Sequence, residues 1–234
     1  KATEAISTFE TSGFDLFDVN GKGVLYLKQN KGFSKKALMA EAGAESSCIS
    51  VAAADFDNDM DLDLYMVCTG PVTNLPNRLL ENDGKGGFVL VPDAGGAAGS
   101  EFGRGDVAAV ADYDRDGFLD LFVTNGADPN SIFEAEGPHQ LFRNQGNHNH
   151  WLEIDLEGVV SNRDAIGSRV EVLAGGVTQV REQTGGMHRI AQNHQRLHFG
   201  LGLNQQVDRI TVIWPGGIVQ NLQKIQAGQI LRII

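Results

Sequence analysis

The sequence lacks the features that would place a protein in a membrane or on nucleic acid. No apolar run approaches the ~20 residues that a membrane-spanning helix needs. Lys and Arg number 19 against 30 Asp and Glu, and they form no stripe of the kind that binds phosphate backbones. We therefore expect no membrane insertion and no nucleic-acid partner. The chain also has no signal peptide and starts at Lys1, so we expect a processed form or a piece of something longer.

Motifs that carry catalysis are missing as well. There is no Gly-x-Ser-x-Gly elbow, no P-loop, no dinucleotide fingerprint and no metalloprotease helix. The two cysteines have no evident catalytic partner in the sequence. We therefore expect a protein that is not an enzyme.

Two acidic segments stand out instead, Asp55–Asp63 (DFDNDMDLD) and Asp112–Asp120 (DYDRDGFLD). Each places Asp at the first, third, fifth and ninth of nine positions. So many neighbouring carboxylates repel one another unless a cation neutralises them, and Ca²⁺, which takes six to eight oxygen ligands, suits such a loop. The alternative is a solvated polar turn. Two copies in one register favour calcium, with the 112–120 loop as the clearer of two sites.

The sixth position distinguishes the two loops. Gly117 permits the positive φ that a chain wrapping an ion needs. Met60 stands there in the first loop, and a non-glycine residue at positive φ costs about 1 kcal/mol. We therefore expect the 55–63 site to be weaker or differently shaped. Neither loop is an EF-hand, because Val123 and Met66 stand where a bidentate Glu is required.

Cys48 and Cys68 flank the first acidic loop. If that loop closes a hairpin with residue 54 opposite residue 62, then residue 48 falls opposite residue 68. A cross-strand disulfide is then possible, although a change of register by one residue would part the two sulfurs. Two separate buried thiols are the alternative.

The first 147 residues repeat. The loop-and-strand units 54–66 and 111–123 are each followed by a Leu-x-x-Asn signature, at Leu79–Asn82 and Leu141–Asn144. A degenerate copy of the loop at Thr8–Phe17 lacks most of the acids, so we expect no ion there. A period of roughly 50–60 residues built from short strands and Gly-rich turns is typical of a β-propeller. The best helix candidate, Lys35–Ala42, is short.

The pattern changes at about residue 148. Residues 1–147 carry 23 acids and 11 bases, whereas residues 148–234 carry 7 acids and 8 bases. In the second part, Arg169–Ala174 and Val177–Glu182 alternate around a Gly-Gly pair, which predicts a hairpin. Ile210–Trp214 and Ile218–Leu222 flank Pro-Gly-Gly, which predicts a second hairpin. We expect two domains, 1–147 and 148–234.

The repeats resemble the FG-GAP/VCBS class of β-propellers, in which a loop of the form Asp-x-Asp-x-Asp-Gly-x-x-Asp holds calcium. The C-terminal part resembles the ASPIC/UnbV domain, through the stretches Asn149–Leu152, Ser161–Val170, His198–Gly202 and Val212–Gly217. The resemblance implies an all-β fold, with a partial β-propeller of about three blades, the first degenerate, followed by a small β-sandwich-like domain. The implied calcium ligands are the side chains of Asp55, Asp57, Asp59, Asp63, Asp112, Asp114, Asp116 and Asp120, with the carbonyls of Asp61 and Phe118.

The resemblance implies a secreted, calcium-binding, non-catalytic scaffold for binding or adhesion, placed extracellularly, at the cell surface or in the periplasm. Three blades cannot close a ring, and open sheet edges are prone to pairing. An alternative is therefore a subunit of a larger surface assembly, with self-association through open blade edges. A second alternative is a carbohydrate-binding accessory domain of a secreted enzyme. The partner is thus an unidentified protein or glycan.

Two further constellations have simpler explanations. The tripeptide Arg104–Asp106 has the sequence that integrins recognise, but it leads directly into an expected strand at 106–111. The histidines do not indicate zinc, because packing and hydrogen bonding within the ASPIC/UnbV-like motifs account for His148, His150 and His198.

Overall fold

The computed structural model describes residues 24–28, 33–37, 47–69, 75–126, 137–188 and 191–234. This described part is all-β, as the sequence predicts, and contains no α-helix. Nor does this part of the chain hold a helix long and apolar enough to cross a membrane. The strands form several open sheets, and their bounds are β1 Val24–Lys28, β2 Phe33–Ala37, β3 Ser47–Ala54, β4 Asp63–Thr69, β5 Arg78–Asn82, β6 Phe88–Val91, β7 Arg104–Ala111, β8 Asp120–Gly126, β9 Gln140–Phe142, β10 His150–Leu156, β11 Arg169–Ala174, β12 Val177–Glu182, β13 Met187–His188, β14 Ala191–Gln192, β15 Leu197–Gly202, β16 Gln206–Ile213, β17 Val219–Gln226 and β18 Gln229–Ile233.

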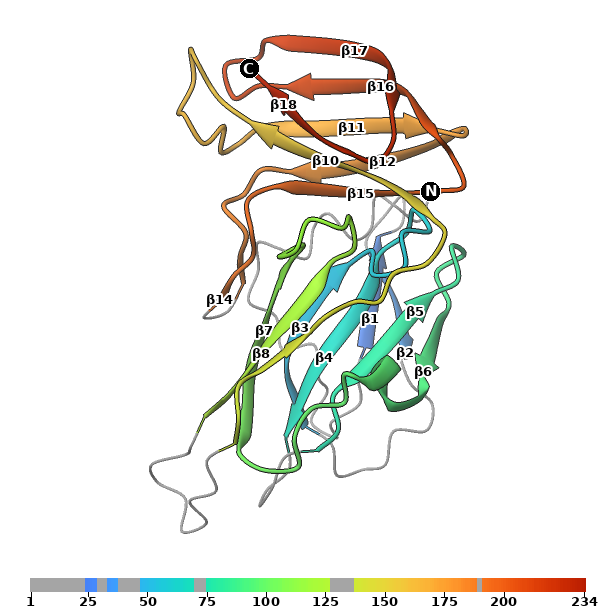
Figure 1. The fold of residues 1–234 in the computed structure, drawn as a ribbon, viewed down its shortest axis with the longest axis vertical. Coiled ribbons are helices and arrows are strands. Elements are labelled where there is room, and N and C mark those ends of the chain that lie inside the picture. The colour runs from blue at the N-terminus through green and yellow to red at the C-terminus, as the bar shows by residue number, and fades with distance from the viewer. Residues whose placement is uncertain (1–23, 29–32, 38–46, 70–74, 127–136, 189–190) are drawn as a thin grey trace.

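Two antiparallel sheets, β3-β4-β5-β6 and β7-β8-β9, form the body of the repeat region (Figure 1). In each sheet an acidic loop joins the first two strands. The sheets bury a shared apolar cluster that includes Tyr65 and Val67 of β4 and Leu121 and Val123 of β8. The opposite face of β4 contributes Leu64 and Met66 to a separate cluster. Side chains of β4 thus alternate between two apolar clusters, one shared with β7-β8-β9 and one made mainly with residues of its own sheet.

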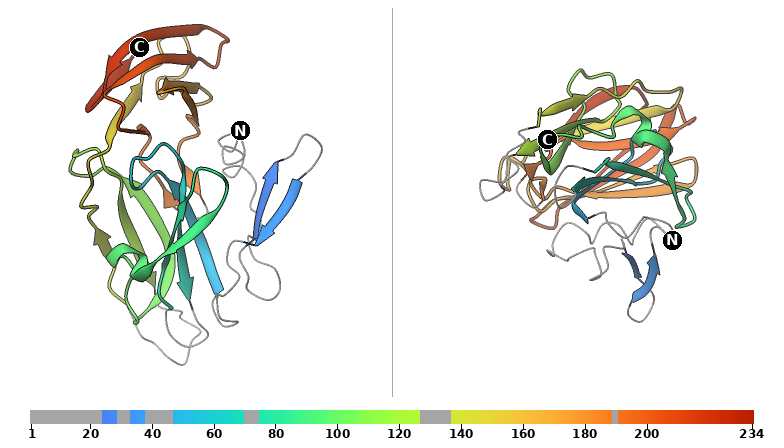
Figure 2. Two further views of the ribbon diagram at one scale, coloured as in Figure 1. Left: turned by 90° about the vertical axis from the view of Figure 1, so that its right-hand side faces the viewer. Right: turned by 90° about the horizontal axis from the view of Figure 1, so that it is seen from below.

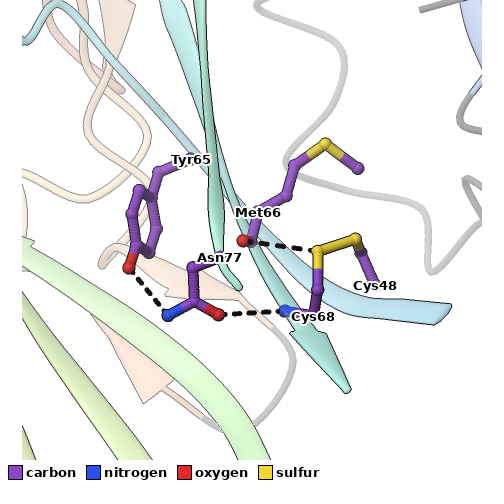
Figure 3. Close-up of a disulfide and its surroundings, with 5 residues drawn as sticks. All are labelled: Cys48, Tyr65, Met66, Cys68 and Asn77. Atoms are coloured by element: carbon purple, nitrogen blue, oxygen red, sulfur yellow. Dashed lines mark hydrogen bonds between the residues drawn. A yellow bond between two sulfur atoms is a disulfide. The ribbon is translucent and has the colours of Figure 1, made fainter. Parts of the chain in front are cut away.

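A disulfide joins Cys48 of β3 to Cys68 of β4, which decides between the two alternatives left open by the sequence (Figure 3). The expected register was nevertheless wrong by one residue, since Ala54 pairs with Asp63 rather than with residue 62. A bulge between Cys48 and Ser50 shifts the register back, so that the two cysteines still face each other. An extra residue on one strand of an antiparallel pair has this effect.

The C-terminal part consists of two further sheets, β15-β10-β18 and β12-β11-β16-β17. Both predicted hairpins are present, as β11–β12 and β16–β17. The sheets face each other across an apolar core that includes Ile154, Val172, Phe199 and Ile210, all fully buried. This packing of two sheets around one core is a β-sandwich-like arrangement.

The remaining strands are short. β1 and β2 form an antiparallel hairpin, which lies to one side of the larger repeat sheets (Figure 2). The helix expected over Lys35–Ala42 is wrong for Lys35–Ala37, which belong to β2, because pairing with β1 overrides a weak local preference. Residues 38–42 lie outside the described residues, as does the degenerate loop at Thr8–Phe17.

Candidate metal-binding loops

The first Asp of each acidic loop organises the turn. The two carboxylate oxygens of Asp55 accept hydrogen bonds from the backbone N–H groups of Asp59 and Met60, both at 3.0 Å. Asp112 accepts the corresponding bonds from Asp116 and Gly117, at 3.1 and 2.9 Å. The two loops therefore share one backbone path, set by the same side chain.

The ninth Asp closes the loop and ties it to the neighbouring strand. Asp63 accepts from the N–H of Phe56, at 3.1 Å, and from the N–H of Asn82, at 3.0 Å. Asp120 repeats this arrangement, with Tyr113 and Asn144 as donors. Because Asn82 and Asn144 end the two Leu-x-x-Asn signatures, this signature is the attachment point of the loop.

The structure brings together the acids at the first, third and fifth positions of each loop. Oxygens of Asp55, Asp57 and Asp59 lie within 4.8 Å of one another, and so do those of Asp112, Asp114 and Asp116. Asp63 and Asp120 are outside these groups, and histidine is absent from such groups among the described residues. The ligand roles of these acids, and of the Asp61 and Phe118 carbonyls, remain predictions.

Burial makes the first loop electrostatically unfavourable. It is the main cause of the raised pKa of the Asp55 carboxyl, which reaches about 7; the charge of Arg181 lowers this pKa, and those of Asp59 and Asp57 raise it. Burial likewise raises the pKa of Asp63 to about 8 and that of Asp61 to about 7. The charged forms of these groups therefore need a partner that water does not supply here.

The sixth position takes the same backbone conformation in both loops, with φ of 87° at Met60 and 89° at Gly117. The shape of the first loop is therefore kept despite the missing glycine, while its weaker affinity stays a prediction. Met60 packs against the C-terminal core and accepts a hydrogen bond at its sulfur from Asn204. This contact between the two regions explains why a side chain is used at a position that otherwise favours glycine.

Gly117 cannot carry a side chain, because the indole of Trp151 occupies the space. A Cβ at this position would lie 1.8 Å from the ring, well inside van der Waals contact. The positive φ of Gly117 favours glycine, and the close approach of β10 requires it. The second loop meets the C-terminal domain through this contact.

Both loops meet the C-terminal domain through their backbone. The Gly117 carbonyl accepts a hydrogen bond from the Asn58 amide at 3.0 Å and lies 3.1 Å from Nε2 of His198. The Asn58 carbonyl accepts in turn from the N–H of Gly202, at 2.7 Å. Burial lowers the pKa of His198 to about 4, so the ring is neutral at pH 7 and can donate from Nε2. We call this set of contacts the domain joint.

Three asparagines after β9 complete the joint. The side-chain amide of Asn144 donates to the carbonyl of Phe56, at 2.7 Å. The amides of Asn147 and Asn149 both donate to the carbonyl of Asp57, at 2.6 and 2.8 Å. The connecting segment thus runs along the first loop before it enters β10.

Sequence reasoning found the acids of both loops but missed most of the joint. Asn58 is fully buried, although its position in the acidic loop suggests a solvated residue. Its φ is 61°, which Asn tolerates better than most residues. The asparagine at this loop position was therefore the available signal in the sequence. The interpretation of His198 as a packing and hydrogen-bonding residue agrees with its buried place in the joint.

Comparison with known proteins defines the class of the C-terminal part. Residues 158–234 match the model of the family described as ASPIC and UnbV. These residues include β11, β12 and β15–β18, which form most of the sandwich. The C-terminal region of this chain therefore belongs to the ASPIC and UnbV family.

The particular relatives are cartilage acidic proteins. The chain is 30% identical over 175 residues to cartilage acidic protein 1 of Xenopus tropicalis, which covers 72% of this chain and 25% of the relative. It is 28% identical over 194 residues to the protein of that name from Homo sapiens, which covers 79% of this chain and 28% of the relative. The chain thus spans about a quarter of the length of these relatives.

Proposed function

We propose that this chain is a calcium-stabilised, non-catalytic scaffold for binding or adhesion, and that calcium in the two acidic loops fixes the position of the C-terminal domain. One observation carries the proposal. The same short loops that gather three carboxylates on one side form hydrogen bonds to the C-terminal domain and its connecting segment from their backbone on the other. An ion that orders the loop therefore orders the joint.

The donor set fits calcium. Each loop offers three carboxylates whose oxygens approach within 4.8 Å, and hard oxygen donors of this kind suit Ca²⁺ better than softer metals. In the first loop, burial already disfavours the charged carboxylates, so a divalent ion would remove an existing penalty. Asp55, Asp57 and Asp59 would hold one ion, and Asp112, Asp114 and Asp116 the other.

A location outside the cytosol supports this function. The Cys48–Cys68 disulfide is of the kind that persists in oxidising compartments. Extracellular modules also bind calcium with dissociation constants in the millimolar range, which calcium-poor cytosol would not fill. The relatives named for cartilage are consistent with such a place. We therefore place the chain outside the cell, at its surface or in the periplasm.

The arrangement of the repeat sheets supports a partial β-propeller of FG-GAP/VCBS type. Two sheets that each carry an acidic loop between their first strands pack face to face, which is how propeller blades stack. We propose three blades, with the β1–β2 hairpin as the remnant of the degenerate first one.

Calorimetric titration of the chain with CaCl₂ tests the proposal, together with melting curves in calcium and in chelator. We expect two sites and a stabilisation of about 2.7 kcal/mol per site at 100 times the dissociation constant. Asp57→Asn and Asp114→Asn should each remove one site. Asp208→Asn, an exposed acid outside the loops, is the matched control and should bind like the unsubstituted chain. Absence of both heat and melting shift would refute the proposal.

A specific feature of β7-β8-β9 favours a second candidate, a subunit of a larger assembly. Because Asp63 and Asp120 are equivalent, Tyr65 of β4 corresponds to Phe122 of β8. Tyr65 is completely buried against the next sheet, whereas Phe122 is 43% exposed and the adjacent Leu141 is 53% exposed. A hollow of about 380 Å³ lies over this face. Within the chain, such a face is covered by another sheet of the same kind, so we propose a second copy of this chain as its occupant.

Light scattering after size exclusion tests this second candidate. We expect an oligomer that Phe122→Glu dissociates, while Val160→Glu at an 86% exposed position leaves it intact. A monomer at all concentrations would contradict self-association and leave the calcium proposal standing.

A further inference from the structure

The residue before the closing asparagine differs in charge between the two loops. The Leu-x-x-Asn signatures place Glu81 next to Asn82 and Arg143 next to Asn144. Each asparagine donates its backbone N–H to the ninth Asp of its own loop. Glu81 and Arg143 therefore occupy the same place relative to two loops of the same shape.

Arg143 supplies a cation to the second loop. Its Nε lies 2.5 Å from Oδ2 of Asp114, and its Nη2 lies 3.0 Å from Oδ2 of Asp116. These acids stand at the third and fifth positions of the loop, and they are two of the three carboxylates that gather there. The guanidinium therefore competes with any metal ion for the same oxygens.

The first loop has the opposite surroundings. Glu81 stands where the second loop has Arg143, and its negative charge acts on Asp57. The loop also has a fifth acid, Asp61, whose Oδ1 is buried and accepts no hydrogen bond from the described residues. Its carboxylates are thus crowded by further negative charge, and the energy to be gained from a cation is larger.

We propose that Arg143 is a tethered counter-ion that lowers the calcium affinity of the 112–120 loop, so that the 55–63 loop is the tighter of the two sites. This inference rests on the proposed function. It reverses the order expected from Met60 alone. Met60 and Gly117 have nearly the same φ, so the backbone conformation does not make the two calcium affinities differ. The charges around the loops do.

Single-site backgrounds make the inference measurable. In a chain with Asp57→Asn and Asp59→Asn, only the second loop is left to bind calcium. Adding Arg143→Gln should tighten calcium binding about fivefold, because it removes an exposed cation that competes with the ion for the oxygens of Asp114 and Asp116. Arg163→Gln is the control, since Arg163 is also exposed and lies near an acid, Glu157, away from both loops. It should leave the affinity unchanged.

The reciprocal background tests the first loop. With Asp114→Asn and Asp116→Asn in place, Glu81→Arg should weaken calcium binding by more than Glu81→Gln does. Glu101→Gln, an exposed acid elsewhere, provides the matched control. In the unsubstituted chain, the first site to fill should be the one that Asp57→Asn removes.

Terbium gives an optical readout of the second loop in the background that carries Asp57→Asn and Asp59→Asn. Trp151 lies against Gly117, so terbium bound by the 112–120 loop should emit when tryptophan is excited. Arg143→Gln should move the midpoint of this emission to lower terbium concentration. In chelator the same variant should melt at a lower temperature than the unsubstituted chain, because it has lost its internal cation. A purely structural role for Arg143 would lower the melting temperature without shifting the terbium midpoint.

The possible failures are distinguishable. Two sites whose affinities do not respond to Arg143→Gln would overturn this inference alone, as would a second loop that binds more tightly than the first in the unsubstituted chain. No calcium binding by either loop would overturn the proposed function and this inference together.

Discussion

The repeat region and the C-terminal domain bury their sheets by different means. The C-terminal domain has two sheets that close on one continuous apolar core, and its charges nearly balance. The repeat region divides its buried side chains between two clusters on either side of β4, and adds a disulfide and two carboxylate-rich loops. The C-terminal domain is stabilised chiefly by packing, whereas the repeat region adds a disulfide and, under the proposed function, calcium in its acidic loops. Substitutions, reductant and acid should therefore affect the stability of the two regions to different extents.

Gly117→Ala should have the largest effect, because it attacks the contact between the regions. The added Cβ meets the Trp151 ring, and Ala is unfavourable at a φ of 89°. Overpacking and backbone strain together should cost about 3 to 4 kcal/mol. Urea unfolding followed by Trp fluorescence measures this. Gly216→Ala is the control, since a Cβ there meets nothing within 4 Å; a similar loss in both variants would refute the explanation.

Removal of the disulfide should destabilise the repeat region alone. Cys48→Ala with Cys68→Ala opens a link between residues 20 apart, and a loop of this length contributes about 3 kcal/mol. Hydrogen exchange should become faster in β3 and β4 but stay slow in β11 and β16. Reductant should affect the unsubstituted chain and spare the variant. Equal acceleration in both regions would show that they unfold as one unit, and the comparison would fail.

Acid should weaken the joint through His198. Burial lowers the pKa of its ring from 6.5 to about 4, so between these values the unfolded chain binds a proton that the folded chain excludes. Stability is therefore lost as the pH falls through this window. Arg181 adds to the effect as a neighbouring positive charge.

The matched variant for this pH effect is His198→Gln, which keeps a donor for the Gly117 carbonyl. From pH 7 to pH 5, the unsubstituted chain should lose about 2 kcal/mol more than the variant. Glu153 has the opposite sign, because burial raises its pKa to about 7, but it is common to both proteins and cancels in the difference. Urea unfolding at the two pH values measures this difference. Equal losses in both proteins would show that His198 does not contribute to the pH dependence.

Asn149→Ala should have the smallest effect. Its amide donates to the Asp57 carbonyl from a half-buried position, and loss of such a bond costs about 1 kcal/mol. Asn147 donates to the same carbonyl from a more exposed position, so Asn147→Ala should cost less. Thermal melts of the two variants in calcium rank them. The reverse ranking would mean that burial does not decide the strength of these bonds.

The sequence predicts features that are encoded within one repeat or one turn. The acidic loops, the positive φ at Gly117 and the hairpin at Gly175-Gly176 each depend on residues within a few positions of one another. The disulfide was a possibility for a similar reason, since the loop sets the pairing of β3 with β4. The expected register of β3 with β4 was wrong, because the bulge next to Cys48 leaves no periodic signal in the sequence.

The joint was not predictable, because its partners are far apart in the chain. Asn58 meets Gly117, His198 meets Gly117, and Asn149 meets Asp57, and no spacing rule connects these positions. The exchange of glycine for Met60 is an example: it appeared as a defect of the loop, and only the neighbouring C-terminal core gives it a purpose. Tertiary contact decides such residues.

The outer edge of β7 has a consequence for aggregation. Val110 donates its N–H to Oδ1 of Asn193 and accepts at its carbonyl from the N–H of His194, so the C-terminal domain covers a strand edge that would otherwise be open. Unpaired edges recruit strands from other molecules. Loss of this contact would leave the β7 edge open at Val110, so we expect repeats produced without residues 148–234 to aggregate by strand pairing more readily than the whole chain.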